Sequence, residues 1–190
     1  MPSAEAWDAI APGYASRAAS FTAAFAPELL AAAHASSSSG GAAAESEGGG
    51  LAVLDVAAGS GAVALLAATS PTVGSVHACD LSPAMLEQLS AAAASLPGTA
   101  APIEATACDA TTLPMPSDTY ARPKPLLPPF PFPALRSSVV QDAVASNFGV
   151  IFAPDVGAGL AEMARVCKPV KAPLDHLQTV SGPPTRSSPC

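Results

Sequence analysis

Residues 51–61 read LAVLDVAAGSG, an apolar run that ends in an acid and a glycine-rich turn. The first part of this segment, 51–56, predicts a buried strand. Gly59 and Gly61 allow the backbone to turn sharply directly after that strand. The alanine- and leucine-rich run at 62–69 then predicts a helix that ends near Pro71. Together these features predict a strand–turn–helix unit, the repeating element of α/β proteins.

The same unit recurs downstream. The sequence VHACD at 76–80 predicts a second strand, IEATAC at 103–108 a third, and DAVASNFGVIF, from about Asp142, a fourth. Strands that alternate with helices favour a parallel sheet with helices on both faces. The expected strand order in this sheet is 3-2-1-4.

Two of the expected helices carry clear start signals. Ser82 and Pro83 suit the N-cap and the first position of the helix after the second strand, and Asp155 suits the N-cap of the helix after the fourth. Apolar residues at helical spacing predict the faces that these helices bury: Met85, Leu86 and Leu89 in the first, and Leu160, Met163, Ala164 and Cys167 in the second.

The remaining segments divide by composition. Apolar residues at helical spacing predict helix over 6–33, broken at Pro12–Gly13, whereas Ser and Gly dominate 35–50. The expected division is an N-terminal helical cap over 1–34, a flexible linker over 35–50, the α/β domain over 51–168 with a proline-rich exposed insert at 121–141, and an irregular tail over 169–190. A complete fold of this type continues with more strands, so we expect the sheet to be incomplete on its C-terminal side.

Composition and charge exclude several classes of function. The formal net charge is −7, which argues against non-specific binding to the phosphate backbone of nucleic acid. The histidines and cysteines lack metal-ligand spacing, so no metal site is expected. No uninterrupted apolar run is long enough for a membrane span, and the N-terminus lacks a clear targeting signal. We therefore expect a cytoplasmic protein.

Polar groups follow three of the expected strands. Ligands bind beyond the carboxyl ends of the strands in open parallel sheets. Asp55 lies near the carboxyl end of the first strand, the glycine-rich turn follows it, and the next helix presents free N–H groups there. Asp80, at the end of the second strand, can accept hydrogen bonds from both hydroxyls of a ribose. Asp109, at the end of the third strand, can accept a hydrogen bond from an exocyclic amine.

Several of these segments, taken in order, resemble a known family. LDVAAGSG, CDLSPAML, CDATTLPMPSDTY and DAVASNFGVIFAPD, followed by GLAEMARVCKP, resemble class I methyltransferases that use S-adenosylmethionine, and WDAIAPGY resembles the opening helix of the ubiquinone/menaquinone-biosynthesis type. The resemblance covers roughly residues 6–168 without the linker and the insert. It implies a Rossmann-like fold, the cofactor S-adenosyl-L-methionine and a small-molecule methyl acceptor.

The resemblance also implies a role for individual residues. The loop from Asp55 to Gly61, with Ala57 at the usual position of the first glycine and Gly59 in the middle, would hold the methionine part of the cofactor. The other implied positions are Asp80 at the ribose hydroxyls, Leu81 and Met85 near the adenine, Asp109 and Ala110 at the adenine amine, and Asn147 and Phe148 facing the reacting methyl group. No catalytic base is identified by the sequence.

Two alternatives remain open at this level. A dinucleotide-binding enzyme that uses NAD would carry a third glycine, which the loop here lacks. A truncated chain that binds cofactor without catalysis is the other alternative. The fourth strand is long and almost uncharged, as strands buried on both faces are, so we expect self-association through an exposed edge of the sheet.

Overall fold

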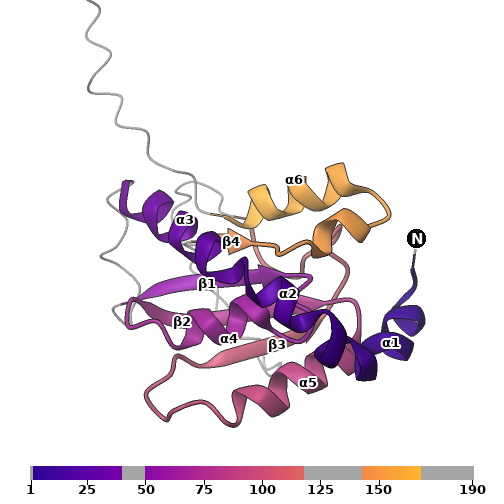
Figure 1. The fold of residues 1–190 in the computed structure, drawn as a ribbon. Coiled ribbons are helices and arrows are strands. Elements are labelled where there is room, and N and C mark those ends of the chain that lie inside the picture. Colours follow the sequence, from indigo (N-terminus) through magenta and orange to yellow (C-terminus); the bar gives the residue numbers. More distant parts are fainter. Residues whose placement is uncertain (1, 40–49, 118–142, 168–190) are drawn as a thin grey trace, which may run out of the picture.

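The computed structural model describes residues 2–39, 50–117 and 143–167. Its centre is a sheet of four parallel strands in the order β3-β2-β1-β4 (Figure 1). The strands are β1 (Leu51–Val56), β2 (Val73–Asp80), β3 (Ile103–Ala107) and β4 (Ala143–Ala145). The predicted strand order and the parallel arrangement are therefore confirmed. Because all strands run in one direction, their carboxyl ends meet at a single edge of the sheet.

Helices cover both faces of this sheet. They are α1 (Ala4–Arg17), α2 (Ala19–Ala23), α3 (Ala26–Ser39), α4 (Ala62–Ala68), α5 (Pro83–Ala93), the 3-10 helix η1 (Gly149–Phe152) and α6 (Val156–Val166). Alternate strand residues supply the two cores, because successive side chains on a strand point to opposite faces. Val53 packs with residues of α3, α4 and α5, whereas Leu54 packs with Leu113, Met115 and Val166 of the opposite layer. The Rossmann-like architecture is thus present.

Both predicted helix starts are confirmed. Ser82 Oγ accepts a hydrogen bond from Met85 N at 3.1 Å, and Pro83 is the first residue of α5. Asp155 Oδ1 accepts from Ala158 N at 2.9 Å at the start of α6. These oxygens satisfy N–H groups that have no partner inside their helices.

The N-terminal prediction was wrong in two details. The helix does not break at Pro12–Gly13, because Pro12 lies inside α1 and the break comes at Ala18. Packing on α5 holds α1 together across the proline, with Gln88 Nε2 donating to Ala11 O at 2.7 Å. The predicted linker at 35–50 also starts too early, since α3 continues to Ser39. Serine disfavours a helix interior only slightly, so a helix already formed extends into a serine run.

The fourth strand is shorter than predicted. Pairing stops at Ala145, and the chain turns into η1 instead of continuing as a strand to Phe152. The polar side chains of the segment cause this turn. Ser146 Oγ accepts from Val150 N at 3.1 Å, Asn147 Nδ2 donates to Thr22 O at 2.7 Å, and Phe148 adopts a left-handed φ of 65°. The edge expected to drive self-association is therefore only three residues long in the described strand, and self-association stays a prediction.

The predicted core face of α6 is confirmed only in part. Met163 packs against the core, whereas Leu160 is 52% exposed and Ala164 is exposed. The buried residues of the helix are Gly159 and Val166, which share a helix face with Met163 at the spacing i, i+4, i+7. The polar residues Glu162 and Arg165 occupy the border of that face and bind the preceding loop.

Other predictions fall outside the described residues. The insert at 121–141, the tail at 169–190 and most of the linker belong to this group. Within the helices that the structure describes, none has the length and apolar character needed to cross a membrane.

Arg165 joins α6 to the loop at residues 113–117. Its Nε and Nη2 donate to the two oxygens of Glu162, both at 2.6 Å, and its Nη groups also donate to Leu113 O and Met115 O, both at 2.9 Å. Glu162 in turn accepts from Leu113 N at 2.9 Å. This network holds the buried side chains of Leu113 and Met115 against the sheet.

We predict that Arg165→Met lowers the free energy of unfolding by about 1–2 kcal/mol, because the loop carbonyls of Leu113 and Met115 lose their Arg165 donor and Glu162 keeps only the donor from Leu113 N. Urea denaturation measures the change. Arg17→Met, at an exposed arginine of α1, is the control and should change stability by less than about 0.5 kcal/mol. Equal stability of the two variants would show that the network contributes nothing.

Candidate cofactor-binding site

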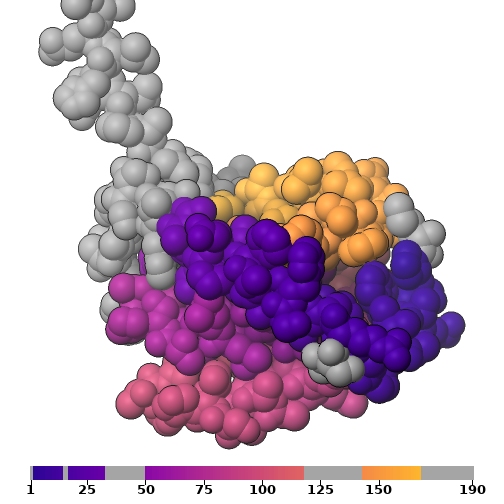
Figure 2. Space-filling view, viewed as in Figure 1, coloured from indigo at the N-terminus to yellow at the C-terminus, as the bar shows by residue number. Residues whose placement is uncertain are grey.

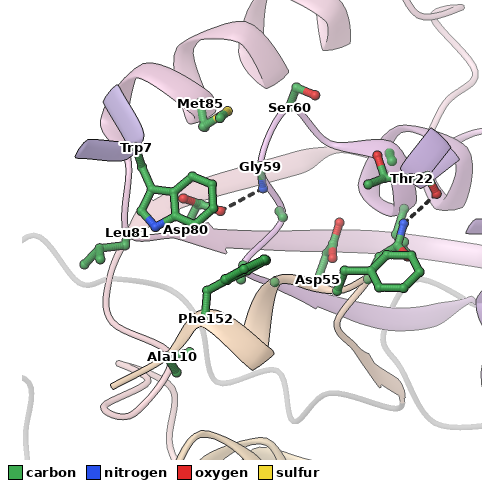
Figure 3. A pocket seen from close by; sticks show the side chains of 18 of the residues that line it. Trp7, Thr22, Asp55, Gly59, Ser60, Asp80, Leu81, Met85, Ala110 and Phe152 are labelled. Atoms are coloured by element: carbon green, nitrogen blue, oxygen red, sulfur yellow. Dashed lines mark hydrogen bonds between the residues drawn. The ribbon is translucent and has the colours of Figure 1, made fainter. Parts of the chain in front are cut away.

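A pocket opens at the carboxyl edge of the sheet (Figure 3). It encloses about 900 Å³, part of which is open to solvent. The structure brings together in its wall ten of the predicted residues: Asp55, Ala57, Gly59, Asp80, Leu81, Met85, Asp109, Ala110, Asn147 and Phe148. This grouping follows from the parallel sheet, which places the ends of β1, β2 and β3 side by side. The specific contacts of these residues with a cofactor stay predictions.

Gly61 is not among the lining residues. It precedes α4 with a φ of 92°, and a Cβ on Gly61 would lie 2.7 Å from Leu89 Cγ. Its glycine is therefore required by the close packing of the turn against α5. Gly59, with a φ of 56°, does line the pocket, and a Cβ there would come only to 3.9 Å from the ring of Tyr14. Glycine is thus favoured at position 59 by the left-handed backbone conformation, and the space beside it remains open for a ligand.

Asp55 is a buried carboxylate with one unused oxygen. Its side chain is 1% exposed, Oδ2 accepts from Ala64 N at 3.0 Å, and Oδ1 has no hydrogen-bond partner. Burial raises the pKa of Asp55 to about 7, an effect that the bond from Ala64 reduces and the nearby Asp80 charge increases. A buried acceptor without a donor is costly. Asp55 Oδ1 therefore marks a position where a ligand donor would be stabilising.

Asp80 connects the two loops at the ends of β1 and β2. Its Oδ2 accepts from Gly59 N at 2.8 Å, which Figure 3 shows as a dashed line, and its Oδ1 accepts from Ser82 N at 2.8 Å. Burial raises the pKa of Asp80, while the N–H groups of Ser82, Gly59 and Leu81 lower it and Asp8 raises it. A carboxylate has about four acceptor positions, so the N–H groups of Gly59, Ser82 and Leu81 leave at least one for a ligand.

Asp109 is held in place by the turn that follows β3. Its Oδ1 accepts from both the N–H and the hydroxyl of Thr111, each at 2.8 Å. The side chain is partly exposed in the pocket wall. These two bonds fix the orientation of the Asp109 carboxylate.

Asn147 has a structural contact that the sequence does not reveal. Its Nδ2 donates to Thr22 O at 2.7 Å and so links the end of β4 to α2. Phe148 packs edge-to-face with Phe25 and tilted against Phe21, with ring centroids at 5.1 and 5.9 Å. Both residues thus attach the N-terminal helices to this end of the pocket.

The N-terminal helices supply lining residues that sequence reasoning missed. Trp7 and Tyr14 of α1 and Thr22 of α2 line the pocket, as does Phe152 of η1. The seven-residue spacing of Trp7 and Tyr14 places them on one helix face, which was the available signal. That spacing does not tell which surface the face covers, so it could not place the two rings over a ligand site.

The charged residues of the pocket lining that the structure describes are all acidic. Among the described residues that line it, the charged ones are Asp55, Asp80 and Asp109, and none is Lys, Arg or His. In the same described part of the chain, no cluster of His, Cys, Asp and Glu could hold a metal ion. Such a pocket favours a ligand that carries positive charge and several hydrogen-bond donors.

Comparison with known families agrees with this geometry. Residues 53–122 match a family model described as a methyltransferase domain. The matched segment contains most of β1, the glycine turn, β2 and β3, which supply part of the pocket wall described above. This segment of the chain is therefore similar to methyltransferase domains.

Curated proteins that match this chain include two described as uncharacterized. The chain is 37% identical over 120 residues to the uncharacterized proteins Rv1405c of Mycobacterium tuberculosis and Mb1440c of Mycobacterium bovis, an alignment that covers 63% of this chain. The chain spans about a third of the length of these relatives, since the alignment covers 34% of each.

Two of the solved structures that match share the fold of this chain. One, from Methanococcus maripaludis, is described as a candidate S-adenosylmethionine-dependent methyltransferase. It has a TM-score of 0.51 and 18% identity, covering 87% of this chain and 59% of its own. The other is a candidate methyltransferase solved with the Trm112 activator of Haloferax volcanii. It has a TM-score of 0.50 and 20% identity, covering 86% of this chain and 56% of its own.

A close approach between Gly149 and Ala57 shapes the pocket floor. Ala57 has a left-handed φ of 55°, and a Cβ on Gly149 would lie 2.3 Å from Ala57 Cβ and 2.6 Å from Ala57 O. We predict that Gly149→Ala lowers the free energy of unfolding by about 1–3 kcal/mol. Ala57→Gly removes one of the clashing atoms and the unfavourable φ, so it should recover part of that loss.

A double-mutant cycle in urea measures the coupling of these two substitutions. Gly98→Ala is the control, because a Cβ there meets nothing within 4 Å. The packing account fails if Gly149→Ala is as stable as the control, or if the loss is the same with and without Ala57→Gly.

Proposed function

We propose that the chain binds S-adenosyl-L-methionine in this pocket and transfers its methyl group to a small-molecule acceptor. The observation that carries the proposal is the pocket's set of carboxylates, with a buried unpartnered Oδ1 on Asp55 and no basic side chain in the described lining. S-adenosylmethionine presents an ammonium and a sulfonium group, whereas the pyrophosphate of NAD is anionic. The charge of the site therefore supports the former over the dinucleotide alternative.

The residues present fit this cofactor group by group. Asp55 Oδ1 would accept from the ammonium, which supplies the donor that this buried oxygen lacks. Asp80 would bind the ribose hydroxyls through its remaining acceptor positions. Asp109 and Ala110 would bind the adenine amine, and Leu81 and Met85 would contact the adenine ring.

When bound, the cofactor supplies a methyl group on a sulfonium that is already activated for displacement. The chain's own contribution is therefore proximity and orientation. The left-handed turn at Ala57 and Gly59 lets the backbone approach the ligand closely, and the buried carboxylates hold it in a fixed position. Because the cofactor is already activated and the chain contributes orientation, methyl transfer needs no catalytic base from the protein. We therefore assign no residue as a general base.

The acceptor and the cellular setting belong to the proposal as well. The resemblance of the sequence to small-molecule methyltransferases supports a small-molecule acceptor, and a cytoplasmic location remains a prediction. Binding without turnover is the alternative, in which the chain is a cofactor-binding module. Incubation with methyl-labelled cofactor and candidate acceptors distinguishes the two, because only an enzyme releases S-adenosylhomocysteine in step with labelled product.

We predict that Asp80→Ala weakens S-adenosylhomocysteine binding by about 10- to 150-fold, the equivalent of about 1.5–3 kcal/mol for hydrogen bonds to a charged group. Isothermal titration calorimetry measures the dissociation constant. Glu87→Ala, at an exposed acid of α5, should leave it unchanged. Equal affinity of wild type and Asp80→Ala would contradict the assignment, and tighter binding of NAD than of S-adenosylhomocysteine would contradict the proposed function.

We also predict that binding releases a proton at pH 6. The free protein holds Asp55 mostly protonated there, because burial raises its pKa to about 7. A ligand ammonium at Oδ1 favours the charged carboxylate and lowers that pKa, so up to about one proton leaves. Affinity should accordingly rise from pH 5 to pH 7 and then level off.

Calorimetry in buffers with different ionisation enthalpies counts the protons released. Asp55→Asn should abolish the release, since the side chain then has no titrating group. Proton uptake, or release that persists in Asp55→Asn, would show that the ammonium does not lie beside Asp55.

A further inference from the structure

Helix α1 lies across the cofactor pocket, although it comes from the far end of the sequence. Figure 2 shows the N-terminal helices lying over the sheet domain, and Figure 3 shows Trp7 in front of Asp80. Trp7 and Tyr14 both line the pocket. The interactions that fix α1 in this place therefore decide whether the pocket has this wall.

Asp8, the neighbour of Trp7, makes the polar contacts at this end of α1. Its Oδ1 accepts from Ser82 Oγ at 2.5 Å and from Ala84 N at 3.1 Å, at the N-terminus of α5. The positive end of a helix stabilises an acid in this position. One turn further along α1, Gln88 Nε2 donates to Ala11 O at 2.7 Å. Helix α1 is thus fixed to α5 by hydrogen bonds at two successive turns.

Ser82, which bonds to Asp8, also bonds to the Asp80 carboxylate. Ser82 is fully buried, and its hydroxyl accepts from Met85 N while donating its hydrogen to Asp8. The backbone N–H of Ser82 donates to Asp80 Oδ1 at 2.8 Å. Because a hydroxyl has one hydrogen, the bond to Asp8 also fixes the rotation of the Ser82 side chain. Asp8, Ser82 and Asp80 form one connected series.

A second contact, between the rings of Trp7 and Phe152, joins α1 to η1 at the pocket. Trp7 packs edge-to-face against Phe152 of η1, with ring centroids 5.3 Å apart. Both rings line the pocket. The pair bridges α1 and η1 near Asp80 and Leu81 (Figure 3). This is the end of the pocket where the proposed function puts the nucleoside.

We propose that Asp8 is a positioning residue for the nucleoside half of the cofactor. It holds Trp7 as a wall over the ribose site and, through Ser82, holds Asp80 in its binding orientation. The inference rests on the proposed function, because it assigns the Asp80 end of the pocket to a ribose. A purely structural role for Asp8, as a cap of α5, would change stability without selecting one half of the ligand.

Two probes separate the halves of the ligand. S-adenosylhomocysteine contains both the nucleoside and the amino acid, whereas 5′-methylthioadenosine lacks the ammonium and carboxylate. Asp8→Ala should weaken both ligands by about the same factor, roughly 10-fold, because it removes two hydrogen bonds to a charged group at the nucleoside end. Asp55→Asn should weaken S-adenosylhomocysteine and leave 5′-methylthioadenosine unchanged.

A conservative variant of Asp8, a control on the same helix and the fluorescence of Trp7 complete the test. Asp8→Asn keeps an acceptor oxygen and should show a smaller loss than Asp8→Ala, and it keeps the test informative if Asp8→Ala disrupts α1. Glu5→Gln, an exposed acid on the same helix, is the matched control and should bind as wild type. Trp7 is the single tryptophan of the chain, so its fluorescence reports ligand at this wall. The emission change on adding 5′-methylthioadenosine should be reduced in Asp8→Ala.

The outcomes are distinct. Wild-type affinity for both ligands in Asp8→Ala overturns the inference and leaves the proposed function standing. Weakened binding of S-adenosylhomocysteine alone also overturns it, since Asp8 would then act on the amino-acid half. Absence of S-adenosylhomocysteine binding in the wild type overturns the proposed function and this inference with it.

Discussion

The hydrogen bond from Gly59 N to Asp80 Oδ2, at 2.8 Å, joins the turn after β1 to the end of β2, and the site depends on it. It requires a left-handed backbone at Gly59 and an acid at the last residue of the neighbouring strand. A parallel register brings these two points together, since β1 and β2 end at the same edge. The pocket thus results from the parallel pairing of β1 and β2. The Asp80 carboxylate both lines the pocket and stabilises the turn at Gly59.

Burial gives the carboxylates of this site their chemical character. Asp55 is almost inaccessible and has a pKa raised to about 7, and the pKa of Asp80 is raised as well. An uncompensated buried charge of this kind is destabilising to the free protein. A ligand that brings positive charge and donors offsets that cost on binding. Under the proposed function, this cost in the free protein would favour binding of a cationic ligand.

Sequence alone predicted the features that local pattern and parallel topology determine. Asp55, Asp80 and Asp109 were placed at strand ends by the alternation of apolar runs and turns, and a parallel sheet forces such ends together. The N-cap at Ser82 followed from local chemistry in the same way. In contrast, the wall formed by Trp7 depends on tertiary contacts of Asp8 with residues more than 70 positions away, which no local pattern encodes. The short β4 was missed because apolar content favoured a strand, whereas Ser146 and Asn147 hydrogen-bond away from the ladder.

The structure of the chain bound to S-adenosylhomocysteine tests the central claim most directly. The account predicts that both ribose hydroxyls lie within hydrogen-bond distance of the Asp80 carboxylate. It also predicts that the ligand ammonium lies within hydrogen-bond distance of Asp55 Oδ1. Trp7 should remain in contact with the nucleoside at the mouth of the pocket. A ligand bound elsewhere, or bound here with its ribose away from Asp80 and Asp55 Oδ1 still without a donor, would contradict it.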